Sequence, residues 1–71
     1  MKLPRDLSGA DIVKALQRLG FRVERQKGCH IQLSKATVHV TVPAHKPVKT
    51  GTLNSILKQA GIDADELIEN L

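Results

Sequence analysis

Aromatic residues are almost absent from this chain of 71 residues, which has one Phe and no Tyr or Trp. Proteins that hold single-stranded nucleic acids usually stack the bases on aromatic rings. A nucleic-acid partner of this chain would therefore have to be bound through charge, shape and hydrogen bonds. At this length, we expect residues 1–71 to form one domain with a single core.

Cysteine and long apolar runs are scarce as well. A single Cys cannot form an internal disulfide, which is typical of a protein from a reducing compartment. The first residues, MKLPRDLSG, contain no apolar run long enough for a signal peptide. No stretch approaches the roughly 20 apolar residues that a membrane span requires. We therefore expect a cytoplasmic protein that does not insert into a membrane.

Metal-binding patterns are also missing from the sequence. One thiol and three His match the spacing of no compact zinc finger or ribbon, and no carboxylates cluster to hold a divalent cation. We expect neither a metal nor another cofactor.

Charge is abundant but unevenly placed. Residues 1–62 hold eleven Lys and Arg against three acids, a balance of +8, whereas residues 63–71 carry four acids and no base. A basic surface of this kind attracts phosphate backbones and acidic partners, although it is also compatible with simple solubility.

The helices are marked by their ends. Ser8 can cap a helix whose apolar residues repeat at helical spacing up to Gly20, and Asp11 completes a capping box. The stretch 50–61 predicts a second helix, capped by Thr50 or Thr52. Residues 63–71 predict a short last helix, which we expect to pack on the domain, although it could also fold over the basic face or dock on the partner.

Between the first two helices, apolar and polar residues alternate in three short runs, 21–27, 30–33 and 37–42. Such runs with tight connections predict an antiparallel meander with one apolar face. The fold class is therefore α+β, in the order α-β-β-β-α with a short C-terminal helix, and the helices cover the apolar face. The open face should carry Arg22, Glu24, His30, Gln32, Thr37, His39 and Thr41.

His30 is the candidate reactive residue on this open face. A turn at residues 34–36 that paired Leu33 with Val38 would place His30 opposite Thr41, with His39 about one pair away. By the same alternation Cys29 should point into the core as a small apolar residue, which argues against a Cys–His nucleophilic pair.

The groups around His30 are basic. Arg25 and Lys27 come just before it, Gly28 allows another backbone to approach closely, and a loop with His45, Lys46 and Lys49 returns toward the second helix. Imidazole titrates near neutral pH and can move a proton between two oxygens. Beside cations that hold a phosphate, this chemistry could cleave RNA through its own 2′-hydroxyl. An exposed His on a strand is, however, more often a solvated surface residue.

The sequence as a whole resembles the HicA family of bacterial and archaeal toxins. The stretch LSGADIVKALQRLGFRVERQKGCH is similar to the opening of the family, which has a helix, then Leu-Gly-Phe, a basic residue and Gly-Ser-His. The stretch VTVPAHKPVKTGTLNSILKQAGI is similar to its second half, in which Val-Pro-x-His precedes Gly-Thr-Leu and a helix. The resemblance covers nearly the whole chain.

The resemblance implies a fold like that of a double-stranded-RNA-binding domain. It also implies the activity of an mRNA-cleaving ribonuclease, the toxin of a type II toxin–antitoxin system that is neutralised by a HicB-type antitoxin. The family's catalytic histidine closes Gly-Ser-His and corresponds to His30, with Gly28 before it. This chain departs from the pattern at Cys29, where Ser is common.

Three functions follow from these observations. The first is a metal-independent endoribonuclease, with His30 as its catalytic residue and with RNA bound by Arg25, Lys27, Gly28, His39, Lys46 and Lys49. His39 and Lys27 are the candidates for the second acid or base. The alternatives are a non-catalytic RNA-binding module and a subunit whose main role is to bind an acidic protein partner.

Overall fold

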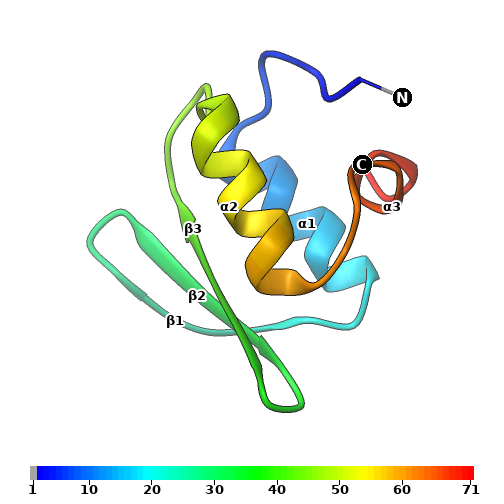
Figure 1. Ribbon diagram of the computed structural model, residues 1–71. Helices are drawn as coiled ribbons and strands as arrows, with labels where there is room; N and C mark the ends of the chain where they lie inside the picture. The colour runs from blue at the N-terminus through cyan, green and yellow to red at the C-terminus, as the bar shows by residue number, and fades with distance from the viewer. Residues whose placement is uncertain (1) are drawn as a thin grey trace.

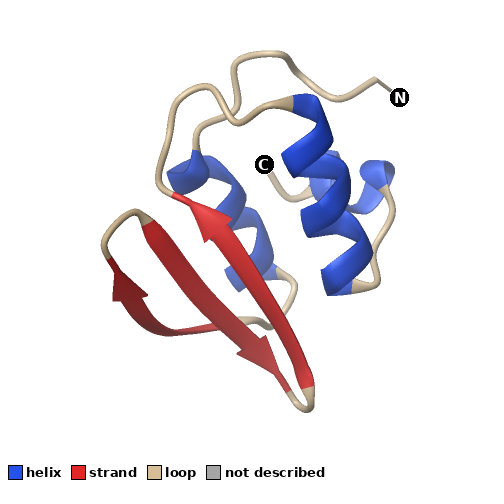
Figure 2. Cartoon of the chain, turned by 60° about the vertical axis from the view of Figure 1, so that its left-hand side comes forward, coloured by secondary structure: helices blue, strands red, loops and turns tan. Residues whose placement is uncertain are grey.

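The structure is a computed structural model and describes residues 2–71. A three-stranded antiparallel sheet of order β1-β2-β3 has both longer helices on one face, and its other face is open (Figures 1 and 2). This arrangement confirms the predicted α+β class and the α-β-β-β-α order. The elements are α1 (Gly9–Arg18), β1 (Arg22–Lys27), β2 (His30–Lys35), β3 (Val38–Pro43), α2 (Thr50–Ala60) and α3 (Ala64–Glu69).

The first helix begins and ends as its sequence predicts. The Ser8 hydroxyl accepts a hydrogen bond from the Asp11 N–H at 3.1 Å, and the Asp11 carboxylate accepts one from the Ser8 N–H at 3.1 Å. This reciprocal pair satisfies two backbone donors that the first turn would leave without partners. After α1, Gly20 adopts a φ of 98°, a conformation that glycine takes without steric cost.

The core lies between the sheet and the two longer helices. Ile12 and Leu16 of α1 are completely buried, as is Val42 of β3. The other apolar residues that pack with them are Leu7, Ala15, Phe21, Leu33, Val40, Val48, Leu53, Ile56, Leu57, Ala60 and Leu67. Since the single Phe, Phe21, is among them, the described surface presents no Phe, Tyr or Trp ring to a partner.

The acidic C-terminal segment is part of this core, as predicted. Asp63 and Glu66 form a second capping box at the start of α3, and Leu67 is completely buried. The guanidinium of Arg18 donates a hydrogen bond to the Asn70 carbonyl at 2.6 Å, which ties α3 to the end of α1. The segment therefore packs on the domain.

The start of α2 differs from the prediction that Thr50 or Thr52 caps it. Lys49 is the N-cap residue, and its side chain makes no capping hydrogen bond. The Val48 N–H donates to the Leu7 carbonyl at 2.8 Å, which holds the chain before Lys49 against the segment leading into α1. The helix therefore begins at Thr50, so both threonines lie inside its first turn. Gly61 ends α2 with a φ of 70°, as expected.

The pairing of β2 with β3 is displaced by two residues from the predicted register. Leu33 pairs with Val40 rather than Val38, because the connection is a two-residue turn in which Ala36 has a φ of 53°. A displacement of two residues leaves every side chain on its predicted face. It nevertheless moves His39 opposite Ser34, so the prediction that His39 lies one pair from His30 is wrong.

The turn between β1 and β2 corrects a second prediction. Gly28 and Cys29 form a two-residue connection between Lys27 and His30, and the thiol of Cys29 is exposed rather than buried. The strand alternation that placed it in the core does not extend into the turn. Gly28 has a φ of 60°, and a Cβ added to it would meet nothing within 4 Å. Its backbone conformation, and not the close approach of another chain segment, therefore requires a glycine here.

One extra residue in β1 decides which side chains share the face of His30. Val23 pairs with Leu33 and Arg25 pairs with Gln32, so Glu24 is a bulge with no partner of its own. Directly opposed residues in an antiparallel pair point to the same face of the sheet. The bulge therefore moves Arg25 and Lys27 onto the open face beside Gln32 and His30.

Candidate active site

His30 is the first residue of the central strand, with a neighbour on each side. It pairs with Lys27 of β1 and with Pro43 of β3, and its side chain is exposed on the open face. A strand residue has little freedom of the backbone, so the imidazole leaves the sheet at a defined place. Lys27 lies directly across the β1–β2 turn from His30 and places a cation beside the imidazole.

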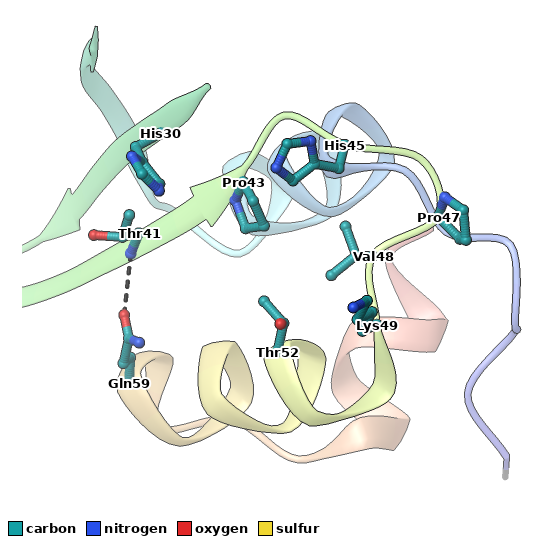
Figure 3. Close-up of a pocket in the computed structure, with 9 residues that line it drawn as sticks. All are labelled: His30, Thr41, Pro43, His45, Pro47, Val48, Lys49, Thr52 and Gln59. Atoms are coloured by element: carbon teal, nitrogen blue, oxygen red, sulfur yellow. Dashed lines mark hydrogen bonds between the residues drawn. The ribbon is translucent and has the colours of Figure 1, made fainter. Parts of the chain in front are cut away.

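A groove of about 570 Å³ opens beside His30. It lies between the end of β3, the loop 44–49 and the first turns of α2, and Figure 3 shows the imidazoles of His30 and His45 on either side of Pro43. The groove is lined by His30, Thr41, Pro43, His45, Pro47, Val48, Lys49, Thr52 and Gln59. Two imidazoles, which can accept or donate protons, and the ammonium of Lys49 therefore line the same open groove.

Backbone hydrogen bonds hold the loop that carries His45. The Ala44 N–H donates to the Cys29 carbonyl at 2.6 Å, and the Gly9 N–H donates to the His45 carbonyl at 2.8 Å. The first bond joins the loop to the β1–β2 turn, and the second joins it to the start of α1. The Lys46–Pro47 peptide bond in this loop is cis.

The close contact between the loop and α1 explains the glycine at position 9. A Cβ on Gly9 would lie 2.0 Å from the Pro43 carbonyl oxygen and 3.1 Å from the Ala44 Cα. Both are backbone atoms, which cannot rotate away as the end of a side chain can. A glycine at this position therefore allows the end of β3 to rest on the first turn of α1.

The helix α2 is attached to the outer edge of β3. The Thr41 N–H, on the side of β3 away from β2, donates to the Gln59 side-chain oxygen at 3.0 Å (Figure 3). This bond satisfies a donor that an edge strand would otherwise expose. It also fixes the wall of the groove opposite the loop.

The model of a protein family described as the HicA toxin of bacterial toxin–antitoxin systems matches residues 9–62. This chain belongs to the HicA toxin family. No curated protein matches the chain. Membership makes this HicA-family chain the toxin of a toxin–antitoxin system, which implies an antitoxin as its partner.

The match to the HicA family covers the residues that form the groove. It begins at Gly9, the first residue of α1, and ends at Ile62, just after α2. Every residue of the groove lies inside these limits, whereas α3 follows them.

The basic residues predicted to bind RNA fall into two groups in the HicA-family chain. Lys27 and Arg25 lie beside His30 on the open face, where the Arg25 Nε donates to the Gln32 side-chain oxygen at 2.9 Å. Gly28 is in the turn that leads to His30. Lys49 lies in the groove itself.

Lys46 and His39 lie outside the groove. The charge of Lys46 acts on Asp11, whose pKa is lowered chiefly by the hydrogen bonds from Ser8 and further by Lys46 and Lys14. His39 lines a separate hollow on the open face. The other residues of this hollow are Glu24, Arg25, Gln32, Leu33, Ser34, Val40 and Thr41.

Among the polar residues of the groove, Gln59 was not singled out from the sequence, and Thr52 was named only as a possible helix cap. Thr52 and Gln59 are seven residues apart on α2, so they lie on one side of the helix beside the buried stripe. A polar pair at this spacing is a signal that a site search could use. The hydrogen bond of Gln59 to a strand edge, by contrast, depends on the packing of α2 and has no sequence signal.

Within residues 2–71, no group of three or more His, Cys, Asp or Glu side chains is placed to hold a metal ion. In the same described part of the chain, no helix is long and apolar enough to span a bilayer.

Proposed function

We propose that this HicA-family toxin is a metal-independent endoribonuclease that cleaves mRNA, with His30 as a catalytic acid or base. The observation that carries the proposal is the position of His30 at the edge of a groove that also holds a second imidazole and the ammonium of Lys49. The resemblance of Gly28-Cys29-His30 to the family's catalytic element supports it.

The chemistry requires groups that this site provides. Cleavage through the 2′-hydroxyl forms a bond from the 2′-oxygen to phosphorus and breaks the bond to the 5′-oxygen. A base removes the proton of the 2′-hydroxyl and an acid protonates the leaving 5′-oxygen. Imidazole can take either role near neutral pH. The cations of Lys27 and Lys49 would hold the phosphate, and the reaction consumes no metal or other cofactor.

The surface favours binding of RNA through its backbone. Residues 1–62 carry a charge of +8, and the single Phe is buried, so the described surface offers no Phe, Tyr or Trp ring on which a base could stack. Phosphate contacts make affinity strongly dependent on salt. Lys27 and Arg25 share the open face with His30, and Lys49 lines the groove, whereas Lys46 and His39 would contact RNA outside the groove.

The partner that restrains the toxin is proposed to be a HicB-type antitoxin. The open face of the sheet is basic, and within residues 2–71 no helix covers it, so an acidic surface would be attracted to it (Figures 1 and 2). We expect such a type II toxin–antitoxin pair to act in the cytoplasm, where mRNA is available and the growth arrest of a stress response would follow.

The test compares the wild type with His30→Ala on a long unstructured RNA in the presence of a chelator. Loss of an acid–base group should slow cleavage by about 10²–10⁴-fold. Fragments with a 2′,3′-cyclic phosphate and a 5′-hydroxyl would identify the 2′-hydroxyl route. Asn54→Ala, a change of an exposed polar residue on α2, is the control for purification and folding.

Three results would contradict the proposal in different ways. Equal cleavage by both proteins would indicate a contaminating nuclease or another site. Cleavage that stops in chelator would contradict metal independence. RNA binding by both proteins without cleavage by either would favour a non-catalytic RNA-binding module.

A further inference from the structure

We propose that His45 is the second member of the acid–base pair, so that His30 and His45 act together on one phosphodiester. The inference rests on the proposed ribonuclease function and names the group which that function leaves unassigned. It stands on the placement of both imidazoles in the groove between β3, the loop 44–49 and α2 (Figure 3).

A backbone hydrogen bond links the two histidines through the residues that precede them. Cys29 comes before His30 and Ala44 comes before His45, and the Ala44 N–H donates to the Cys29 carbonyl at 2.6 Å. The two histidines, fifteen positions apart in the sequence, therefore start from neighbouring points of the backbone. The bond from the Gly9 N–H to the His45 carbonyl fixes the second point from the other side.

The His45 imidazole is exposed, and within residues 2–71 it takes part in no side-chain hydrogen bond or ion pair. Its backbone is held at both the carbonyl and the preceding amide, whereas its ring is left to face the groove. A histidine whose backbone is held in place and whose ring has no other polar partner is suited to act on a ligand.

The other two candidates for the second group are less well placed. His39 pairs with Ser34, four residues along β3 from Pro43, the partner of His30. At about 3.4 Å per strand residue this separation is roughly 14 Å, which is too far for two groups to act on one phosphate. Lys27 lies on the opposite side of His30 from the groove, and its ammonium is suited to hold an anion as a point charge.

The reaction then balances within the groove. One imidazole, neutral at the start, accepts the proton of the 2′-hydroxyl as the 2′-oxygen bonds to phosphorus. The other, protonated at the start, gives its proton to the 5′-oxygen as the bond between that oxygen and phosphorus breaks. The products are a 2′,3′-cyclic phosphate and a 5′-hydroxyl, and no oxidant or other co-reactant is needed. Lys49, in the same groove, would offset the charge that develops on the phosphate.

The experiment measures single-turnover cleavage at saturating RNA for the wild type, His30→Ala, His45→Ala and His39→Ala. We expect His45→Ala to lose about 10²–10⁴-fold in rate, as His30→Ala does, while thermal unfolding stays unchanged. A double variant that carries both His30→Ala and His45→Ala should be little slower than either single variant, because the effects of residues that act as a unit are not additive. We expect the wild-type rate to follow a bell-shaped dependence on pH, and His45→Ala to lose one limb of it.

A substrate with sulfur in place of the 5′-oxygen separates the two roles. A thiolate leaves without protonation, so this RNA should restore the rate of the variant that lacks the acid and not of the variant that lacks the base. Rescue of one of the two histidine variants supports the pair.

The outcomes distinguish the inference from the function beneath it. If the wild type cleaves RNA and His30→Ala does not, while His45→Ala keeps its rate or His39→Ala loses it, the pair is overturned and the ribonuclease stands. Rescue of neither variant by the sulfur substrate would also overturn the pair. If the wild type leaves RNA intact, both proposals fall together.

Discussion

Replacing Gly9 by Ala tests how the groove is held together. The added Cβ would lie 2.0 Å from the Pro43 carbonyl oxygen and 3.0 Å from its carbonyl carbon. Atoms of this kind do not approach so closely, so the end of β3 and the first turn of α1 must separate by about an ångström. The bonds from Gly9 to His45 and from Ala44 to Cys29 lie on either side of this contact.

The cost can be worked out from these contacts. Overpacking of a site that cannot relax costs about 1–3 kcal/mol, and each weakened backbone hydrogen bond adds up to about 1 kcal/mol. The better helix propensity of Ala returns roughly 0.5–1 kcal/mol. We expect a net loss of about 1–3 kcal/mol in the free energy of unfolding. For a domain of this size that corresponds to a fall of roughly 5–20 °C in the midpoint of thermal unfolding.

Gly51→Ala is the matched control, because it makes the same change in the first turn of the other long helix. A Cβ at Gly51 meets nothing within 4 Å, and we expect it to raise stability by about 0.4–1 kcal/mol. The assay is thermal and urea unfolding of both variants beside the wild type. Cleavage of RNA, measured well below the unfolding midpoint, should fall in Gly9→Ala alone, since the loop that carries His45 is displaced.

A Gly9→Ala variant as stable as the wild type would refute the contact between Gly9 and Pro43. A variant that is destabilised but fully active at low temperature would refute a narrower point, namely that this contact positions the groove.

Two further predictions concern α3 and the start of α1. Leu67→Ala should lower the free energy of unfolding by about 2–5 kcal/mol, a large share of the stability of a small domain, because the side chain of Leu67 is completely buried. Urea unfolding measures this loss, and a value under about 1 kcal/mol would show that α3 is not part of the core. The lowered pKa of Asp11 means that the folded state binds its proton less readily than the unfolded chain, so this group stabilises the fold above the ordinary carboxyl pKa of 3.8. That contribution should disappear as the pH falls below this value. In Asp11→Asn the free energy of unfolding should therefore fall less steeply with decreasing pH than in the wild type, and equal slopes for the two proteins would contradict this prediction.

The sequence predicts the elements of this fold well because their signals are local. The capping boxes at Ser8 and Asp63 and the glycines at positions 20 and 61 each involve residues within one turn of a helix. Alternation along β2 and β3 gives the buried and open faces, since that pattern depends on one strand at a time. The α+β order follows from these signals.

Register is harder to predict, because it depends on turns whose geometry the sequence does not announce. Ala36 takes a positive φ in the β2–β3 turn, a conformation for which Gly or Asn would have been the usual sign. The bulge at Glu24 has no composition signal of its own, although the Glu24 carboxylate accepts a hydrogen bond from the Ser34 hydroxyl. Neither the turn conformation of Ala36 nor the bulge at Glu24 can therefore be predicted from the residue types alone.

The candidate site shows the same division. The special place of His30 among basic residues can be predicted from the chain alone. The presence of His45 in the same groove could not be predicted, because the predicted strand register was displaced by two residues and favoured His39 instead. Cys29 was misplaced for a related reason, since alternation was applied to a residue that belongs to a turn.

The position of Gln59 has a consequence for the timing of the proposed activity during synthesis of the chain. Its hydrogen bond to Thr41 closes one wall of the groove, and it lies near the end of α2. A nascent chain that already carries both histidines still lacks this wall. If the groove is the site of cleavage, as proposed, a nascent chain should therefore cleave no RNA until α2 has left the ribosome and docked on the sheet. The proposed antitoxin could bind the basic face of β1 to β3 at that same stage.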